Sequence, residues 1–168
     1  MLRALTTVLT ICISSAALAQ EPSGCDKFKW PIERERALLG AATANTEYGP
    51  ELPGVAATGT RIKLKPFESS TLPMAPERVP RDKATNAGYL KIAKVEKSGL
   101  YAVSLSTNGW IDAVQNGKYL KTVAFSGATD CDNIRKVVRF ELTDAPLLLQ
   151  VTGVAADSIA IAVTPVVE

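Results

Sequence analysis

From residue 60 onward, apolar and polar positions alternate along the chain with a period of two. Successive side chains of a strand point to opposite faces, so this alternation is typical of half-buried strands. The pattern predicts strands at residues 60–65, 89–95, 100–106, 110–115, 119–125, 134–142, 147–151 and 158–164. About eight short strands separated by turns predict an all-β fold, a single β-sandwich or jelly roll.

Turn signals separate these segments. Asn108-Gly109 and Asn116-Gly117 each predict a hairpin turn, because both residue types tolerate positive φ. We therefore expect the strands around them to form a meander. Residues 66–86 contain four prolines, at positions 66, 73, 76 and 80, and predict no regular element.

Ahead of the alternating region, residues 31–39 have the features of one short helix. Pro31 suits a first helical position, the carboxylates of Glu33 and Glu35 suit the positive N-terminal end, and Gly40 suits the stop. Residues 41–59 are rich in Ala, Thr, Gly and Pro and predict a loop. The expected organisation is an N-terminal helical segment and loop at 20–59 and a β-sandwich domain at 60–168.

Residues 1–19 have the layout of a secretory signal peptide. Arg3 supplies an early positive charge, residues 4–18 are uncharged and mostly apolar, and Ala17-Leu18-Ala19 matches the small-x-small pattern of a cleavage site. The run is short for a membrane span. We expect cleavage after Ala19, a periplasmic or secreted location, and no membrane-spanning segment in the mature chain.

The cysteines predict one disulfide bond. Cys12 is lost with the signal peptide, which leaves Cys25 and Cys131 in an oxidising compartment. A Cys25–Cys131 bridge is the simplest interpretation, and two buried free thiols or an intermolecular bridge are the alternatives. The spacing is not that of a redox-active Cys-x-x-Cys pair.

Composition excludes several kinds of chemistry. The chain has no histidine, so a Ser-His-Asp triad, a Cys-His pair and histidine-ligated zinc or haem are impossible within it. It has 19 basic residues, of which Arg3 leaves with the signal, against 17 acidic ones. That balance creates no global field that would attract nucleic acid or anionic membranes. We expect no cofactor and no nucleic-acid partner.

The C-terminal part of the chain resembles the β-sandwich modules called pre-peptidase C-terminal domains. The resemblance is carried by SGLYAVSL at 98–105, VRFEL at 138–142 and LLLQV at 147–151. Such modules are usually appended to enzymes and are thought to help in export or substrate contact. The resemblance implies a sandwich fold and an accessory role.

The whole chain also resembles an uncharacterised family of small exported proteins from alphaproteobacteria. The segments that carry this second resemblance are FKWP at 28–31 and FSG at 125–127. It implies secretion and no known activity.

Three aromatic residues are candidate binding residues. Trp110, Tyr119 and Tyr101 could form a platform for a sugar ring, because exposed aromatic faces are common in concave binding sites. The alternative is that they pack in the core or between the sheets. For Trp110, at the start of a predicted strand, we favour the core or an edge.

Basic residues cluster on two predicted strands. They are Arg61, Lys63 and Lys65 on one, and Arg135, Lys136 and Arg139 on the other. Such strips could contact a polyanion such as lipopolysaccharide phosphates. Charges also protect edge strands from pairing, and the near-neutral net charge favours this second interpretation.

Acidic residues give weaker hypotheses. Residues 130–133 place three oxygen-bearing side chains in one loop, but their spacing differs from a known calcium loop and favours a solvated turn. A hydrolase would need two carboxylates across a cleft. The candidates near turns are Asp112, Asp130, Asp132, Glu141 and Asp144.

The sequence therefore predicts a non-enzymatic periplasmic or secreted binding or accessory module. Its expected partner is an unidentified protein or an envelope component such as a polysaccharide. A glycan-binding module is the first alternative, and a carboxylate-dependent hydrolase is the second.

Overall fold

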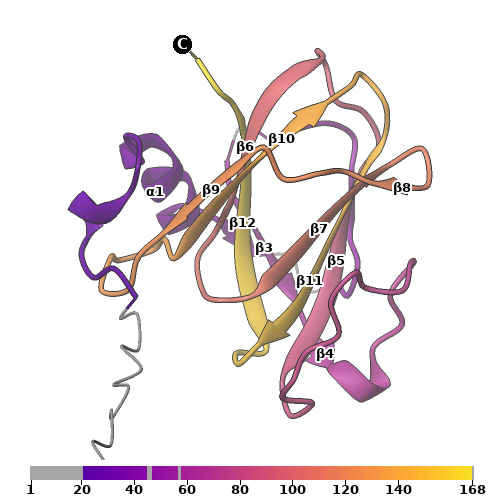
Figure 1. Ribbon diagram of the computed structural model, residues 1–168. Coiled ribbons are helices and arrows are strands. Elements are labelled where there is room, and N and C mark those ends of the chain that lie inside the picture. Colours follow the sequence, from indigo (N-terminus) through magenta and orange to yellow (C-terminus); the bar gives the residue numbers. More distant parts are fainter. Residues whose placement is uncertain (1–20, 45–46, 57, 168) are drawn as a thin grey trace, which may run out of the picture.

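A computed structural model describes residues 21–44, 47–56 and 58–167. Two β-sheets pack face to face, with one short helix at the N-terminal end (Figure 1). The predicted all-β sandwich with a short helix is therefore confirmed. The signal peptide predicted at residues 1–19 lies outside the described residues. No described helix is long and apolar enough to cross a membrane.

The first sheet has six strands. In spatial order they are β1 (Thr43–Ala44), β3 (Thr60–Lys63), β12 (Ser158–Pro165), β6 (Gly99–Leu105), β10 (Lys136–Leu142) and β9 (Ala124–Gly127). All neighbouring strands are antiparallel except the pair β1 and β3. The short strand β9 forms one edge of this sheet.

The second sheet is also six-stranded. Its path is β2 (Glu51–Leu52), β5 (Asn86–Ile92), β11 (Leu147–Val154), β7 (Trp110–Gln115) and β8 (Lys118–Tyr119). The sixth strand, β4 (Lys65–Pro66), pairs with β5 and lies off that path. The 3-10 turn η2 (Phe67–Ser69) follows β4.

The described residues form twelve strands, and the expected eight was too few. Residues 41–59, expected as a loop, contain β1 and β2, each of which adds two residues in parallel to a sheet. Residues 65–66 form the separate strand β4. The single strand expected at 119–125 is two strands, β8 and β9, which belong to different sheets.

The expected meander is correct at one of its two turns. Asn116 and Gly117 have φ of 52° and 70° and join β7 to β8 as a hairpin. Asn108 and Gly109 do not make a hairpin turn, and neither has a positive φ. They lie in the connection from β6 to β7, which crosses between the two sheets. The dipeptide signal reports only local conformational freedom, whereas the pairing of β6 with β10 and β12 decides this connection.

The core lies between the sheets and follows the predicted alternation. Ile111 and Ala113 of β7 and Leu149 and Val151 of β11 point inward and are buried. Their neighbours Asp112 and Gln150 therefore lie on the outer face of the second sheet. This alternation brings polar side chains to that outer face.

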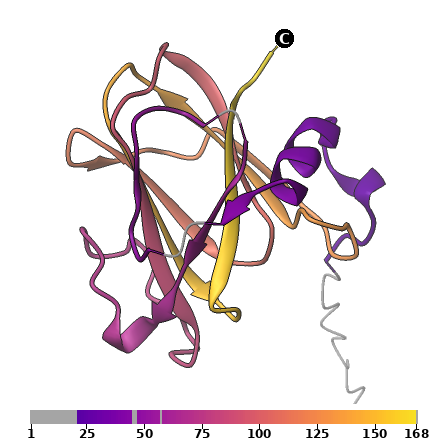
Figure 2. The same cartoon turned by 180° about the vertical axis from the view of Figure 1, so that it is seen from behind.

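A second apolar cluster covers the outer face of the first sheet. Helix α1 (Glu33–Gly40) and the 3-10 turn η1 (Cys25–Lys27) pack there. They lie at the left of the sandwich in Figure 1 and at the right in Figure 2. Phe28, Ile32 and Leu39 bury against small residues such as Ala102 and Ala160. A helix of this length is marginal alone and needs such packing.

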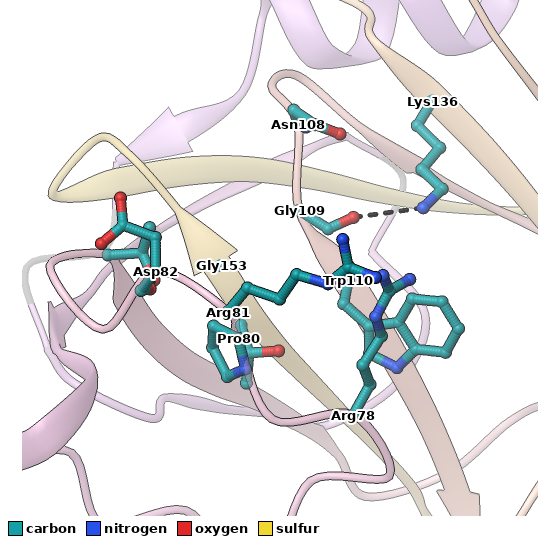
Figure 3. A pocket seen from close by; sticks show the side chains of 11 residues that line it. Arg78, Pro80, Arg81, Asp82, Asn108, Gly109, Trp110, Lys136 and Gly153 are labelled. Carbon is teal, nitrogen blue, oxygen red and sulfur yellow. Dashed lines mark hydrogen bonds between the residues drawn. The ribbon is translucent and has the colours of Figure 1, made fainter. Parts of the chain in front are cut away.

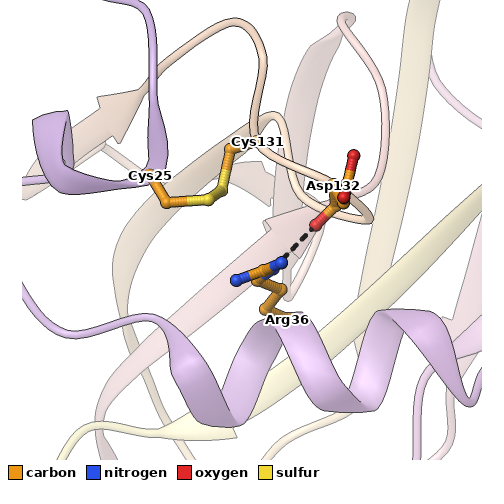
Figure 4. The surroundings of a disulfide bond; sticks show 4 residues. All are labelled: Cys25, Arg36, Cys131 and Asp132. Carbon is orange, nitrogen blue, oxygen red and sulfur yellow. Dashed lines mark hydrogen bonds between the residues drawn. A yellow bond between two sulfur atoms is a disulfide. The ribbon is translucent and has the colours of Figure 1, made fainter.

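The predicted disulfide is confirmed. Cys25 and Cys131 are bonded, with their Cα atoms 4.9 Å apart and a sequence separation of 106 (Figure 4). Beside the bond, Arg36 Nε of α1 donates a hydrogen bond to the Asp132 carbonyl at 3.0 Å. The bridge therefore ties the N-terminal segment to the loop before β10, and a disulfide accords with an oxidising compartment.

Candidate functional site

A groove lies where the two sheets part at one side of the sandwich. Strand β8 pairs only with the last two residues of β7, and β9 has only β10 as a neighbour. Beside β9 and the start of β7, which β8 does not reach, lies a cavity of about 740 Å³. Its lining residues are Lys29, Arg78, Trp110, Ile111, Thr122, Val123, Ala124, Phe125, Lys136 and Val138. We call this cavity the edge groove.

The edge groove exists because the chain changes sheets between β8 and β9. Leu120 N–H donates to the Ala113 carbonyl of the second sheet at 2.8 Å. Three residues later, Val123 N–H donates to the Arg139 carbonyl of the first sheet at 2.9 Å. Residues 120–123 therefore bridge the two sheets, and no long strand closes either edge here.

The edge groove has an apolar floor and exposed apolar walls. Ile111 and Val138, both buried core residues, form the floor. Val123 and Phe125 line the walls and are 55% and 58% exposed. Exposed large apolar side chains gathered in a hollow mark interaction surfaces more often than isolated ones do.

A smaller cavity of about 270 Å³ adjoins this groove. Its lining includes Arg78, Arg81, Asp82, Asn108, Trp110, Lys136 and Thr152 (Figure 3). Arg78, Trp110 and Lys136 line both cavities, so the two adjoin at the indole ring. We call the smaller cavity the cationic pocket.

Trp110 is the centre of both cavities. It lies on the outer side of β7, half-buried, and neither apolar core cluster includes it. The Arg78 guanidinium carbon and the Lys136 ammonium nitrogen lie 5.2 Å and 5.6 Å from its ring centroid. Cations at such distances over an indole are attracted by the ring's negative face. Figure 3 shows Arg78 and Arg81 both reaching toward the indole.

A proline-rich segment, residues 72–80, supplies Arg78 and covers part of the second sheet's outer face. We call it the strap. Buried Gln150 accepts a hydrogen bond from Met74 N–H at 2.9 Å and donates one to the Met74 carbonyl at 3.2 Å. Tyr119 Oη donates to the Ala75 carbonyl. These side chains satisfy strap backbone groups that no strand ladder satisfies, which fixes the strap on the sheet.

Asp112 links the strap to the indole. Its carboxylate accepts hydrogen bonds from Trp110 Nε1–H at 2.6 Å and from Glu77 N–H at 3.2 Å. The side chain is buried, and burial raises the pKa of Asp112 while these two hydrogen bonds oppose the shift. Asp112 therefore orients the Trp110 ring. It also fixes the backbone at Glu77, next to Arg78.

Positive charge in the cationic pocket lacks a carboxylate partner. None of the ion pairs among the described residues involves Arg78, Arg81 or Lys136. Lys136 Nζ donates to the Gly109 carbonyl at 3.2 Å. Burial, with the nearby charges of Arg135 and Arg78, lowers the pKa of Lys136. The only lining carboxylate, Asp82, accepts the N–H of Ala84 at the exposed rim.

Thr152 adds a buried polar group to the cationic pocket. It lies opposite Trp110 on the neighbouring strand β11. Its hydroxyl is buried and has no hydrogen-bond partner among the residues that the structure describes. An unsatisfied buried hydroxyl is costly, so a ligand oxygen that reached it would gain a hydrogen bond.

The structure separates the three predicted aromatic residues. Tyr101 is 6% exposed and belongs to the central core, where its hydroxyl donates to the Lys97 carbonyl. Tyr119 is engaged with the strap. Only Trp110 lines the two cavities, so the three residues form no common platform.

Sequence reasoning did not single out most of the lining residues. Arg78 and Arg81 fall within residues 66–86, where no periodic pattern predicts which way a side chain faces. Lys29 lies near Phe125, with its ammonium nitrogen 5.2 Å from the ring centroid, because Lys29 N–H donates to Ser126 Oγ at 3.0 Å. The sequence did contain one indication of this groove, the mixture of polar and apolar residues at 121–126. That mixture was interpreted as part of the strand predicted at 119–125.

The basic strips do not both protect sheet edges. Strand β10, which carries Lys136 and Arg139, has β6 and β9 as neighbours and is not an edge. Lys136 instead lines the cavities, and the Arg139 guanidinium lies 3.8 Å from the Trp30 ring centroid. On the first strip, Lys65 lies over the Tyr48 ring at 4.3 Å.

The acidic candidates do not converge. Asp112 is beneath the strap, whereas Asp130 is exposed and accepts hydrogen bonds from Ser23 and Thr129. Those hydrogen bonds lower the pKa of Asp130. Within residues 21–44, 47–56 and 58–167, no group of three His, Cys, Asp or Glu side chains could hold a metal ion.

Comparisons with protein-family models, with curated proteins and with solved structures find no match to this chain. The two family resemblances described above therefore stay predictions.

Proposed function

We propose that this protein is an exported, non-enzymatic binding module that holds an anionic component of the cell envelope beside Trp110. The observation that carries the proposal is that Arg78 and Lys136 lie over one indole and Arg81 lines the same pocket, while no ion pair among the described residues involves any of the three. Cations that are already held in place attract an anion without a large ordering cost.

The chemistry of these side chains favours phosphate or carboxylate groups. An arginine guanidinium presents a planar fork of donors that matches both groups, and lysine adds a mobile point charge. Half-burial of Lys136 strengthens its attraction to an anion, because the local dielectric is lower than in water. The unpartnered Thr152 hydroxyl offers one further hydrogen bond.

Neutral glycan binding is less well supported. A sugar ring stacks on an open aromatic face, but two cations already lie over the Trp110 ring. An acidic glycan remains within the proposal. A hydrolase would need a second carboxylate facing Asp112, and Asp82 at the rim is the only carboxylate among the cavity lining residues.

The location in the periplasm or outside the cell is part of the proposal. The signal-peptide pattern at 1–19 and the Cys25–Cys131 bond both support it.

The experiment compares binding to anionic and neutral envelope-like probes. The mature protein is mixed with vesicles of phosphatidylglycerol or phosphatidylcholine, and with beads of polygalacturonate or cellulose, and the sedimented fraction is measured. We expect retention on at least one anionic probe and not on its neutral counterpart. Equal retention on both kinds, or none on either, would overturn the proposal.

A matched pair of arginine variants controls for net charge. Arg78→Gln removes a cation at the pocket, and Arg61→Gln removes one on β3, which three strands separate from the groove edge β9. Arg78→Gln should lower retention on the anionic probe about tenfold, the effect of losing one charge-assisted contact. Equal loss in both variants would show general charge attraction and not this pocket.

A further inference from the structure

We infer that the ligand is an anionic amphiphile, with its charged head in the cationic pocket and an acyl chain in the edge groove. This inference rests on the proposed function and adds the part of the ligand that the cations do not explain. It gives one occupant to both cavities.

The two cavities have complementary chemistry and a shared boundary. Arg78, Trp110 and Lys136 line both, so the two cavities are neighbours and one ligand could contact both across the indole. Arg81 and Thr152 line only the cationic pocket. Val123, Phe125 and Val138 line only the edge groove. The charge and the apolar surface therefore lie at opposite sides of Trp110.

The apolar lining of the groove is concentrated. Four large hydrophobic side chains are exposed among the described residues, namely Val79, Val123, Phe125 and Val167, and two of them line this groove. Its floor reaches the buried residues Ile111 and Val138 between the sheets. The volume of about 740 Å³ falls within the range of small-ligand cavities.

Lys29 fits the same ligand. It lines the groove with its ammonium nitrogen 5.2 Å from the Phe125 ring centroid, and its backbone N–H is anchored to Ser126 Oγ at 3.0 Å. Lysine stems pack along apolar surface while the charge stays in water. Lys29 therefore extends the apolar wall and adds positive charge at the groove's outer rim.

An acidic polysaccharide would leave these features unused. Uronic acid or phosphate groups could occupy the cationic pocket, but a hydrated sugar chain gains little from the buried floor at Ile111 and Val138. An acyl chain gains from every methylene that it buries there. The apolar groove is thus the observation that favours an amphiphile.

The experiment measures affinity as a function of chain length and head charge. Hexyl, octyl and decyl phosphate, each below its micellar concentration, are titrated calorimetrically into the mature protein, with inorganic phosphate and octyl glucoside as comparisons. Each buried methylene should tighten binding about fourfold, so hexyl to octyl should give about 15-fold. Octyl glucoside should bind at least tenfold more weakly than octyl phosphate.

Two exposed valines make a matched test of the groove. Val123 lines it and is 55% exposed, whereas Val79 is 59% exposed and lines neither cavity. Val123→Gln should weaken octyl phosphate binding several-fold and flatten the chain-length dependence. Val79→Gln should change neither. Both substitutions are at the surface, so the variants should fold, and circular dichroism checks this.

The outcomes separate this inference from the proposed function. Binding of inorganic phosphate and polygalacturonate without any gain from longer chains would overturn the amphiphile and leave the anion site standing. No binding of any anionic probe would overturn both. Equal binding of octyl phosphate and octyl glucoside would show an apolar groove only and would also overturn the amphiphile.

Discussion

The two outer faces of this sandwich are covered in opposite ways. On the first sheet, the N-terminal segment packs Phe28, Ile32 and Leu39 against alanines and is tied down by the Cys25–Cys131 bond. On the second sheet, the strap is held by hydrogen bonds to buried Asp112 and Gln150. The N-terminal segment is held by apolar packing and a disulfide bond, whereas the strap is held by polar contacts.

This difference separates stability from binding. Apolar packing and a disulfide stabilise a fold without presenting charge to a ligand. Hydrogen bonds to the strap backbone are directional, and they place Arg78 over an indole that Asp112 also orients. We therefore expect changes on the first face to lower stability, and changes on the second face to lower ligand affinity as well.

The largest expected effect is on the first face, at the disulfide. Replacing Cys25 and Cys131 together by serine removes a constraint on a loop of 106 residues. The chain-entropy model gives about 4.7 kcal/mol for a loop of that size, as an upper value. Denaturant unfolding should show most of this loss, and reduction of the unmodified protein should reproduce it. An unchanged midpoint would contradict the covalent role.

The next effect is at the buried face of α1. Leu39 is 1% exposed, and Leu39→Ala should lower the free energy of unfolding by about 3 kcal/mol through lost burial and a residual cavity. Leu38→Ala, at the half-buried neighbour, is the control and should cost clearly less. Equal losses would mean that Leu39 does not anchor the helix. Octyl phosphate affinity should stay unchanged in both variants when they are folded.

A glutamine pair isolates the strap. Gln150→Leu removes two hydrogen bonds to Met74 and should cost about 1–3 kcal/mol, because strap backbone groups lose their partners. Gln115→Leu is the matched control, since that buried side chain bonds Thr143 and Ala145 instead. Only Gln150→Leu should speed hydrogen exchange at 72–80 and weaken anion binding. The same exchange pattern in both variants would contradict the strap's role.

The smallest expected effect is a pH dependence at Asp112. Burial raises its pKa in the folded state above the ordinary value of 3.8, so the folded protein binds this proton more tightly than the unfolded chain. Protonated Asp112 therefore contributes its full stabilisation below pH 3.8. This contribution is lost as the pH rises through the pKa that Asp112 has in the folded protein. Asp112→Asn should remove this part of the pH profile of unfolding. A profile that steepens instead would contradict the sign.

The sequence predicted what depends on local pattern. Period-two alternation located the core strands, and the Asn116-Gly117 turn and the Cys25–Cys131 bond followed from residue chemistry. It did not predict which strands share a sheet. Pairing is a long-range property, so the crossing after Tyr119 and the connection at Asn108 were missed.

The candidate site was predictable only in part. Trp110 was singled out, although the core or an edge was the favoured place for it. Its half-exposed position depends on the short partner strand β8, which leaves the start of β7 uncovered. Arg78 reaches the ring because Asp112 holds Glu77 N–H from 35 residues away in sequence. No periodicity in an irregular proline-rich segment reports such a contact.

The most direct test of the binding site is a chemical-shift titration of the isotope-labelled mature protein with octyl phosphate. We expect the largest shifts at the Trp110 indole N–H, at Arg78 and Lys136, and along residues 123–125. Residues 33–40 of α1, which cover the opposite sheet, should not respond. Shifts centred on α1, or scattered evenly over the surface, would contradict an anion site beside Trp110.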